Sequence, residues 1–246
     1  MQKRLAGIAT EVYNQKCKLV LTNAEKGEDM TAREIVKRYF LFVVSLFFLG
    51  IGVALTKHAE LGVSPISSVA NVVSLKFTFL SFGTWLTVSN CVLLLGQILL
   101  LRKRFKPIQL LQIPLSFLLG VFTDFGLWLV GGIPNGIYAV RLLLVIGGIA
   151  VIGFGITLGV IADVILNAGE AFVKALADVT GKDFSNMKIA FDVSWVSFSV
   201  VLSLIFFDGA LYGTREGTVL SALLVGVTVK LFRKALQKPL DRLLRK

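Results

Sequence analysis

Long apolar runs, separated by short clusters of charged or turn-forming residues, set the pattern of this chain. Six runs are long enough for a helix, rising about 1.5 Å per residue, to cross about 30 Å of hydrocarbon. They are Lys37–Thr56, Phe82–Leu101, Pro107–Val130, Tyr138–Ile161, Met187–Phe207 and Thr218–Lys234. Thr31 and Glu34 have the spacing of a capping box, which predicts that the first helix begins there. The pattern predicts an all-α, polytopic membrane protein with six transmembrane helices.

Two shorter helical segments lie between these runs. Pro65–Leu75 is too short to cross the hydrocarbon as a helix. Ala168–Thr180 carries Glu170, Lys174 and Asp178, and charged side chains are costly against lipid. We therefore expect two short re-entrant helices, which enter the membrane and return to the same side.

The lysine and arginine residues favour this topology. If both short helices are re-entrant, only four basic residues lie outside: Lys57, Lys76, Arg141 and Arg215. If both crossed fully, the short basic loop Arg102–Lys106 would lie outside, against the positive-inside rule. The chain has no Asn-x-Ser/Thr sequon. We expect a multi-pass protein of the bacterial plasma membrane with both termini in the cytoplasm.

The two halves of the chain match when the sequence is shifted by 103 residues. Gly50–Leu55 (GIGVAL) then falls on Gly153–Leu158 (GFGITL). Each half is predicted to contain a span, a short helix and two more spans, and this odd number of crossings inverts the second copy. The membrane domain, 36–246, divides into repeat one (36–135), repeat two (136–236) and a basic cytoplasmic tail (237–246). A cytoplasmic segment that is amphipathic or flexible precedes it (1–35).

Polar residues occupy matched places in the two short segments. They lie four, three and four residues apart, which puts them on one face of a helix. The tips of two inverted short helices converge near the bilayer midplane, so we predict a substrate-binding cavity lined by both faces. The eight predicted site residues are Glu60, Ser64, Ser67, Asn71, Asp163, Asn167, Glu170 and Lys174. The alternative is that these side chains only bond across helices, with Glu60 and Asp163 as helix N-caps.

Further charged residues within the spans have candidate roles. Asp192 and Lys230 lie at similar depth in the last two spans, which predicts an ion pair or a gate between them. Glu170 is the best candidate for proton coupling if Lys174 does not neutralise it, because a carboxylate in a low-dielectric setting holds its proton more tightly. Gly155 and Gly159 form a GxxxG pair, which indicates close packing of the fourth span against another helix.

Composition and motifs exclude several other functions. The net charge of +11 reflects basic residues beside span ends rather than a nucleic-acid surface. The chain has one histidine and no HExxH, Walker or GxSxG motif, and its two cysteines lack any metal-ligand spacing. We therefore expect neither an enzyme nor a metal or cofactor site. The expected partners are the lipid bilayer and an unknown small polar solute; the oligomeric state stays open.

Three stretches resemble the YczE/YitT group of bacterial integral membrane proteins. They are Gly50–Pro65 (GIGVALTKHAELGVSP), Leu80–Trp85 and Gly217–Gly226, within a likeness that extends from Val36 to Leu236. The resemblance implies fold and location, because the group has no settled activity. The function we expect is transport of a small polar solute, with proton coupling as a further hypothesis. The alternatives are a non-transporting regulatory or assembly protein of the membrane, and a channel.

Overall fold

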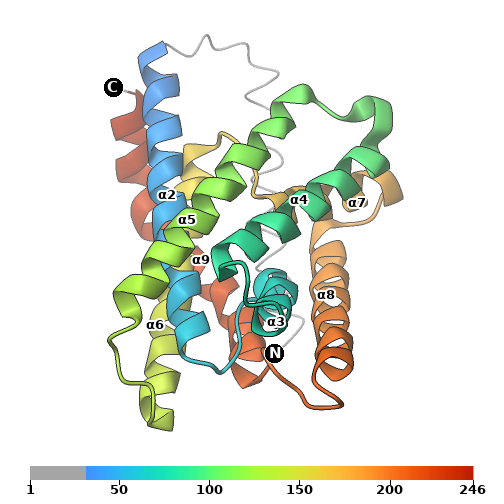
Figure 1. The fold of residues 1–246 in the computed structure, drawn as a ribbon. Helices are drawn as coiled ribbons and strands as arrows, with labels where there is room; N and C mark the ends of the chain where they lie inside the picture. The colour runs from blue at the N-terminus through green and yellow to red at the C-terminus, as the bar shows by residue number, and fades with distance from the viewer. Residues whose placement is uncertain (1–31, 246) are drawn as a thin grey trace.

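The computed structural model describes residues 32–245, and these residues are all-helical, as predicted. Figure 1 shows long helices crossing one another, with the short helix α3 seen nearly end-on. The helices are α2 (Ala32–His58), α3 (Ser68–Lys76), α4 (Phe82–Leu101), α5 (Gln112–Val130), α6 (Tyr138–Ala162), α7 (Ala168–Thr180), α8 (Phe184–Phe206) and α9 (Glu216–Arg245). The three short 3-10 helices are η1 (Pro65–Ser67), η2 (Arg102–Arg104) and η3 (Pro107–Leu111). The predicted amphipathic segment and the Thr31 cap lie outside the described residues.

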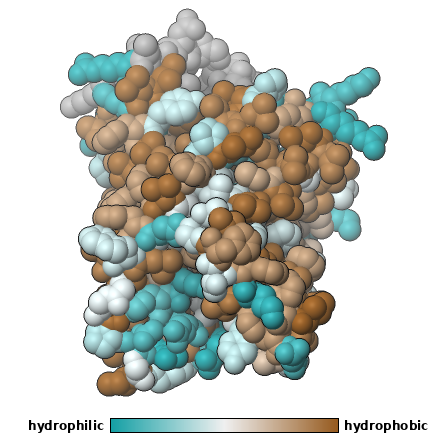
Figure 2. Space-filling view, viewed as in Figure 1, coloured by the Kyte–Doolittle hydropathy of each residue, from teal (hydrophilic) through white to brown (hydrophobic). Residues whose placement is uncertain are grey.

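Five of these helices are long and apolar enough to cross a membrane: α2, α4, α5, α6 and α8. Their outward side chains include many large apolar groups, such as Trp128, which is 76% exposed. Figure 2 shows apolar side chains over much of one face, with hydrophilic ones gathered toward both ends. Apolar surface on this scale needs lipid around it. The protein is therefore a membrane protein.

α9, the sixth predicted span, is not among these five helices. It is a long amphipathic helix that continues past Pro239, and its later turns carry several basic residues. Lys230, Arg233 and Lys234 lie within the stretch that the sequence predicted to cross. These charges make α9 less apolar than the other long helices.

The turns after α2 and α6 have the same backbone shape. Glu60 and Asp163 both adopt left-handed φ angles, of 57° and 52°. Ser64 (φ −57°, ψ 152°) and Asn167 (φ −59°, ψ 149°) then precede the short helices. The prediction of Glu60 and Asp163 as N-caps is therefore wrong. A left-handed residue ends the preceding helix, and the N-cap positions fall four residues later.

Contacts between α2 and α6 are matched at the same spacing of 103 residues. A Cβ atom added to Gly52 would lie 2.7 Å from the backbone nitrogen of Ile152. A Cβ atom added to Gly155 would lie 2.7 Å from the backbone nitrogen of Leu49. Each glycine thus lets the other helix approach, and the two contacts are reciprocal. Close helix packing at Gly155 and Gly159 is confirmed, since α6 meets Ser45 and Leu49 of α2 there.

The helices form two groups, each with two members from either half of the chain. In the first group, α2 packs on α5, α6 and α9, and α6 also packs on α9. In the second group, the short helices α3 and α7 each pack on both α4 and α8. Figure 1 shows the first group at the left and the second at the right, with α5 crossing between them. We call them the α2/α6 group and the α3/α7 group.

The two groups are joined unequally. α5 packs along α4, where a Cβ atom on Gly83 would lie 2.1 Å from the carbonyl oxygen of Gly120. The Asp124 carboxylate accepts a hydrogen bond from the Gly83 backbone N–H (2.8 Å) and another from Ser81. No comparable contact joins α8 to α9 within the described residues. Leu115–Gly120 (LSFLLG) resembles Ser221–Gly226 (SALLVG) once a few inserted residues are allowed for, so Gly226 of α9 matches Gly120. Gly226 has no atom within 4 Å of an added Cβ.

Candidate functional site

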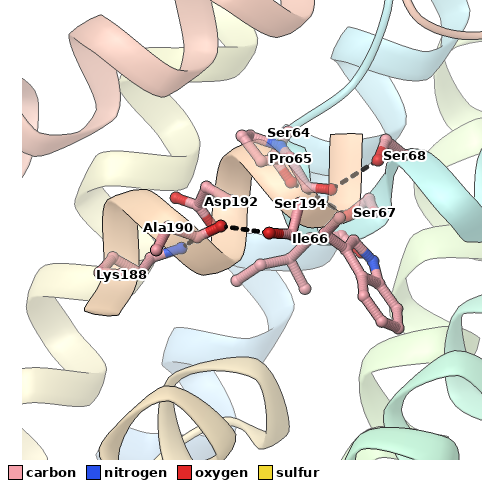
Figure 3. Close-up of polar contacts among 10 residues, drawn as sticks. Ser64, Pro65, Ile66, Ser67, Ser68, Lys188, Ala190, Asp192 and Ser194 are labelled. Atoms are coloured by element: carbon pink, nitrogen blue, oxygen red, sulfur yellow. Dashed lines mark hydrogen bonds and ion pairs between the residues drawn. The ribbon is translucent and has the colours of Figure 1, made fainter. Parts of the chain in front are cut away.

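The first turns of the two short helices meet inside the α3/α7 group. The Ile66 side chain lies over Gly169, where a Cβ atom would be 2.8 Å from Ile66 Cδ1. Side chains of the long helices hold the first-turn carbonyls: Trp195 Nε1 donates to Ile66 O (3.1 Å), and Gln97 Nε2 donates to Ala168 O (3.0 Å). Figure 3 shows η1 lying against α8. Each tip is thus fixed by a long helix from the other half of the chain.

A reciprocal amide pair anchors the tip of α7. Gln97 and Gln112 exchange hydrogen bonds of 3.1 Å and 3.2 Å, and both side chains are buried. The two glutamines are therefore interhelical hydrogen-bond partners. Gln97 therefore joins α4 to α5 and to α7. Loss of one partner would leave a buried amide unsatisfied, at a cost of about 1–3 kcal/mol.

Two small hollows flank Asn167, at the point where the tip of α7 faces the α2/α6 group. The first hollow is bordered by Ser45, Asn167, Glu170 and apolar side chains of α2 and α6. The second is bordered by Asn90, Gln112, Ser116, Asn167 and apolar side chains of α2 and α5. Each holds about 10 Å³, enough for one water molecule. A larger solute therefore requires the two groups to separate.

Several polar groups at these hollows have unused hydrogen-bonding capacity. Asn90 is only 6% exposed, and its amide makes no hydrogen bond with the described residues. Asn167 stands at the N-cap of α7, but its side chain does not cap the helix. Glu170, in the first turn of α7, has no cationic partner within 4.0 Å in the described part of the chain. A polar ligand would find both donors and acceptors here.

The polar groups at the hollows lie near the middle of helices that can cross the membrane. Ser45 lies half-way along α2, and Asn90 lies near the middle of α4. Both helices are among the five that can cross a membrane. Unpaired amides and a carboxylate at such depth are costly unless they serve a ligand or an ion. The hollows around Asn167 are therefore the best candidate for a functional site.

Residues 36–234 match a family of unknown function, DUF6198. The chain belongs to this family. The match covers the two helix groups and both short helices of this DUF6198 protein. No curated protein and no solved structure matches the chain.

The predicted site residues of the first half do not border the hollows in this DUF6198 protein. Asn71 donates to the Gly213 carbonyl (2.6 Å) and accepts from Lys57. The half-buried Lys57 ammonium also lies 4.9 Å from the centre of the Phe82 ring. These contacts fasten α2 and α3 to the loop between α8 and α9. The sequence did not predict this fastening role for Lys57, because only its contacts in the fold reveal it.

The remaining predicted residues are dispersed. Ser64 and Ser67 contact each other (Oγ to Oγ, 3.1 Å), and Glu60 pairs with Arg141 (3.2 Å) at the end of α6 opposite Asp163. Lys174 makes no ion pair with Glu170 in the described structure. Of the eight predicted residues, only Asn167 and Glu170 border the hollows.

The predicted ion pair between Asp192 and Lys230 is wrong. Asp192 pairs with Lys188, one turn earlier on α8 (Figure 3). Lys230 is exposed on α9. Because α8 and α9 diverge, Lys230 is not beside Asp192. Lys188 is, because residues four apart on one helix are neighbours.

Sequence reasoning missed Asn90, Ser45 and Ser116 in this DUF6198 protein. Asn90 had a usable signal, because it is the one asparagine in the apolar run of α4. An asparagine in a membrane span seeks a hydrogen-bond partner. The serines had no such signal, because serine readily bonds to its own helix, as Ser45 does with Phe42 O (2.7 Å).

Proposed function

We propose that this DUF6198 protein transports a small polar solute across the bacterial plasma membrane. The observation that carries the proposal is the placement of unpaired polar groups at mid-depth between two helix groups. Small-molecule sites commonly have mostly apolar walls and a few placed polar groups. A non-transporting regulatory or assembly protein and a channel are the alternatives. The hollows are far too small for an open pore, which argues against a channel in this conformation.

The two halves are proposed to be inverted repeats with six spans, α9 being the sixth, and with two re-entrant helices. The matched backbone angles at Glu60 and Asp163 and the reciprocal contacts of Gly52 and Gly155 support two equivalent halves. Transporters with inverted repeats place broken helices and their sites at the repeat interface. The likeness to the YczE/YitT group stays part of this proposal.

The unequal joints suggest how such a transporter would move. In an inverted pair, the conformation open to the other side is obtained by exchanging the roles of the two halves. Here α4 and α5 are tightly packed while α8 and α9 are apart. We call the contact between α4 and α5 the first joint and the corresponding place between α8 and α9 the second joint. We propose that the α3/α7 group rocks against the α2/α6 group, which would open the first joint and close the second.

If the two halves exchange roles in this way, the polar residues of the first half would line a site in the other conformation. Ser64 and Ser67 would then border the hollow that corresponds to the one around Asn167 and Glu170. Thr218 and Ser221 of α9 have buried hydroxyls without a hydrogen-bond partner in the described structure. When Leu115–Gly120 is aligned with Ser221–Gly226, they match Gln112 and Leu115, and they would join that second site.

The topology is tested by single cysteines in a Cys17→Ser/Cys91→Ser background. We expect an impermeant maleimide to label cysteines at Asn135 and Gly209 in intact cells. Cysteines at Phe105 and Gly181 should react only after the membrane is permeabilised. External labelling at Phe105 would contradict six spans, and the positive-inside rule would have misled us.

Transport is tested in two steps. A thermal-shift screen of the purified protein against a metabolite library identifies a ligand, and uptake of that ligand is measured in proteoliposomes. We expect Asn90→Ala and Asn167→Ala to reduce uptake at least about tenfold, because each removes hydrogen bonds worth about 1–2 kcal/mol. Asn186→Ala, which removes the same side chain at an exposed position near the start of α8, is the matched control. Full uptake by both asparagine variants would overturn this site, and absence of any ligand would favour the non-transporting alternative.

A further inference from the structure

We propose that the exposed face of α9 binds the phosphate group of an anionic phospholipid, in the leaflet on the side of the C-terminus. Lys230 and Lys234 are the residues that hold the phosphate. This inference does not require the protein to transport a solute. It assigns a partner to charged side chains that lie outside the hollows around Asn167.

Four basic residues follow one another along α9 at intervals of four: Lys230, Lys234, Lys238 and Arg242. We call them the α9 cations. All four are exposed, and residues four apart on a helix are neighbours on one face, with about 5–6 Å between their Cβ atoms. In the described part of the chain, none of them forms an ion pair within 4.0 Å. They are therefore available to an anion from outside the chain.

Two acidic residues near this end of α9 do not neutralise the α9 cations. Glu34 pairs with Arg38, on the same helix α2. Asp241 lies within electrostatic range of Arg233, a buried residue on another face of α9 whose Nε also donates to Gln237 (3.1 Å). The face that carries the α9 cations thus keeps its positive charge.

Contacts with α6 place Lys230 and Lys234 at the edge of the hydrocarbon. Thr157 donates to the carbonyl of Val229 (Oγ1 to O, 3.3 Å). From that level α6 continues for five more residues, or about 7.5 Å, to its end at Ala162. Figure 1 shows both helices running toward the same end of the molecule. Lys230 therefore lies just inside the end of a membrane-crossing helix and Lys234 lies level with it, where lipid phosphates are found.

Apolar side chains beside the α9 cations favour a lipid over a water-soluble anion. Leu231 and Leu243 of α9 are both strongly exposed. Lys37 donates to the Leu243 carbonyl (3.3 Å), so the first turns of α2 lie beside the last turns of α9 (Figure 1). There Val36 and Phe40 are also strongly exposed. Basic and apolar side chains that are exposed together are typical of a helix surface that lies against anionic lipid.

The depth of the two lysines explains why they would hold the phosphate. An ammonium group that faces hydrocarbon is costly, and a lysine avoids this cost by extending its long side chain toward the interface. A phosphate between Lys230 and Lys234 would accept a charge-assisted hydrogen bond from each of them. Lys238 and Arg242 stand further along the helix and add a general attraction. Each basic residue close to an anionic surface strengthens binding about fivefold.

The test measures lipid binding to the full-length protein in detergent by native mass spectrometry. The probes are phosphatidylglycerol and phosphatidylcholine with identical acyl chains. We expect the native protein to bind phosphatidylglycerol at least about fivefold more tightly. Lys230→Gln/Lys234→Gln should lower the affinity for phosphatidylglycerol at least about fivefold and leave phosphatidylcholine unaffected, because only the charge is lost. Both side chains are exposed, so the melting temperature should stay at the native value.

Lys103→Gln/Arg104→Gln is the matched control. These two exposed cations lie in η2, at the same end of the molecule as the C-terminus (Figure 1). Adjacent residues of a 3-10 helix point about 120° apart, so they do not converge on one phosphate. We expect this variant to bind phosphatidylglycerol as the native protein does.

Three results would overturn the lipid site. The first is equal binding of the two lipids by the native protein. The second is an equal loss in both variants, which would show that net charge alone attracts the lipid. The third is displacement of phosphatidylglycerol by an equal concentration of inorganic phosphate, which would indicate a site for a soluble anion. None of these measurements depends on solute uptake, so the lipid site and the proposed transport function can fail separately.

Discussion

Replacement of Gly155 by leucine is expected to lower the melting temperature of the purified protein by many degrees and to reduce its yield. A Cβ atom at this position would already lie 2.7 Å from Leu49 N and 2.9 Å from Ser45 O. Both obstacles are backbone atoms, so no side-chain rotation relieves the overlap. The α2 and α6 helices must separate, and α2 and α6 form the most extensive helix contact in the described structure.

The expected loss exceeds that of an ordinary overpacked core, which costs about 1–3 kcal/mol. Separation of α2 and α6 also removes the contacts of Gly52 on the other helix, where an added Cβ atom would lie 2.7 Å from Ile152 N. In a membrane, helix association depends on close packing because lipid is as apolar as the side chains. Little else is available to hold these two helices together.

Gly147→Leu is the matched control on the same helix. A Cβ atom added to Gly147 has no neighbour within 4 Å, and this residue is exposed. Both variants remove one helical glycine and add the same side chain. Melting in detergent, followed by intrinsic fluorescence or aggregation, should separate them clearly. Equal melting temperatures for the two variants would show that α2 and α6 do not approach at Gly155.

The helical fold was predictable because apolar periodicity and turn residues mark helix boundaries. Phe82–Leu101 and Ala168–Thr180 have the bounds expected from the sequence. The spacing of 103 residues also predicted that Gly52 and Gly155 would have equivalent surroundings. Glycines in a membrane helix mark close approach, so sequence alone indicated where the helices touch.

The candidate site was predictable only in part. Asn167 and Glu170 were found because they stand at the start of a short polar helix. Asn71 was misplaced, because its side chain is taken by Lys57 and the Gly213 carbonyl. A sequence shows which face of a helix is polar but not which loop from a distant part of the chain will satisfy it. Asn90 was missed although its place as the one asparagine in the apolar run of α4 is a usable signal.

The difference between the two halves could not be read from the sequence at all. Gly120 and Gly226 occupy matched places, and both follow similar apolar stretches. One is packed against α4 and the other faces open space. The two apolar stretches look alike in the sequence, so only the structure shows that α5 packs on α4 while α9 stands apart from α8. This difference yields the sharpest test of movement.

Gly226→Trp is expected to abolish uptake while leaving the protein folded. The tryptophan fills space that is empty in this conformation, so the melting temperature should stay within a few degrees of the native value. If α8 closes on α9 as α4 closes on α5, a residue of α8 must approach Gly226 closely. In the α4–α5 contact, a Cβ atom added to Gly83 would lie 2.1 Å from the carbonyl oxygen of Gly120. An indole cannot fit there, and the protein would be held in one state, which stops alternating access.

Two control variants define the meaning of that result. Gly120→Trp should fail to fold, because its Cβ atom would lie 2.4 Å from Thr87 Oγ1 and 2.5 Å from Gly83 O. Gly147→Trp, equally exposed on α6 but away from the joint, should both fold and transport. The measurement is uptake of the identified ligand in proteoliposomes at equal protein content. Native uptake by Gly226→Trp would mean that α8 and α9 never close, and the rocking of the α3/α7 group would have to be abandoned even if the site around Asn167 proved correct.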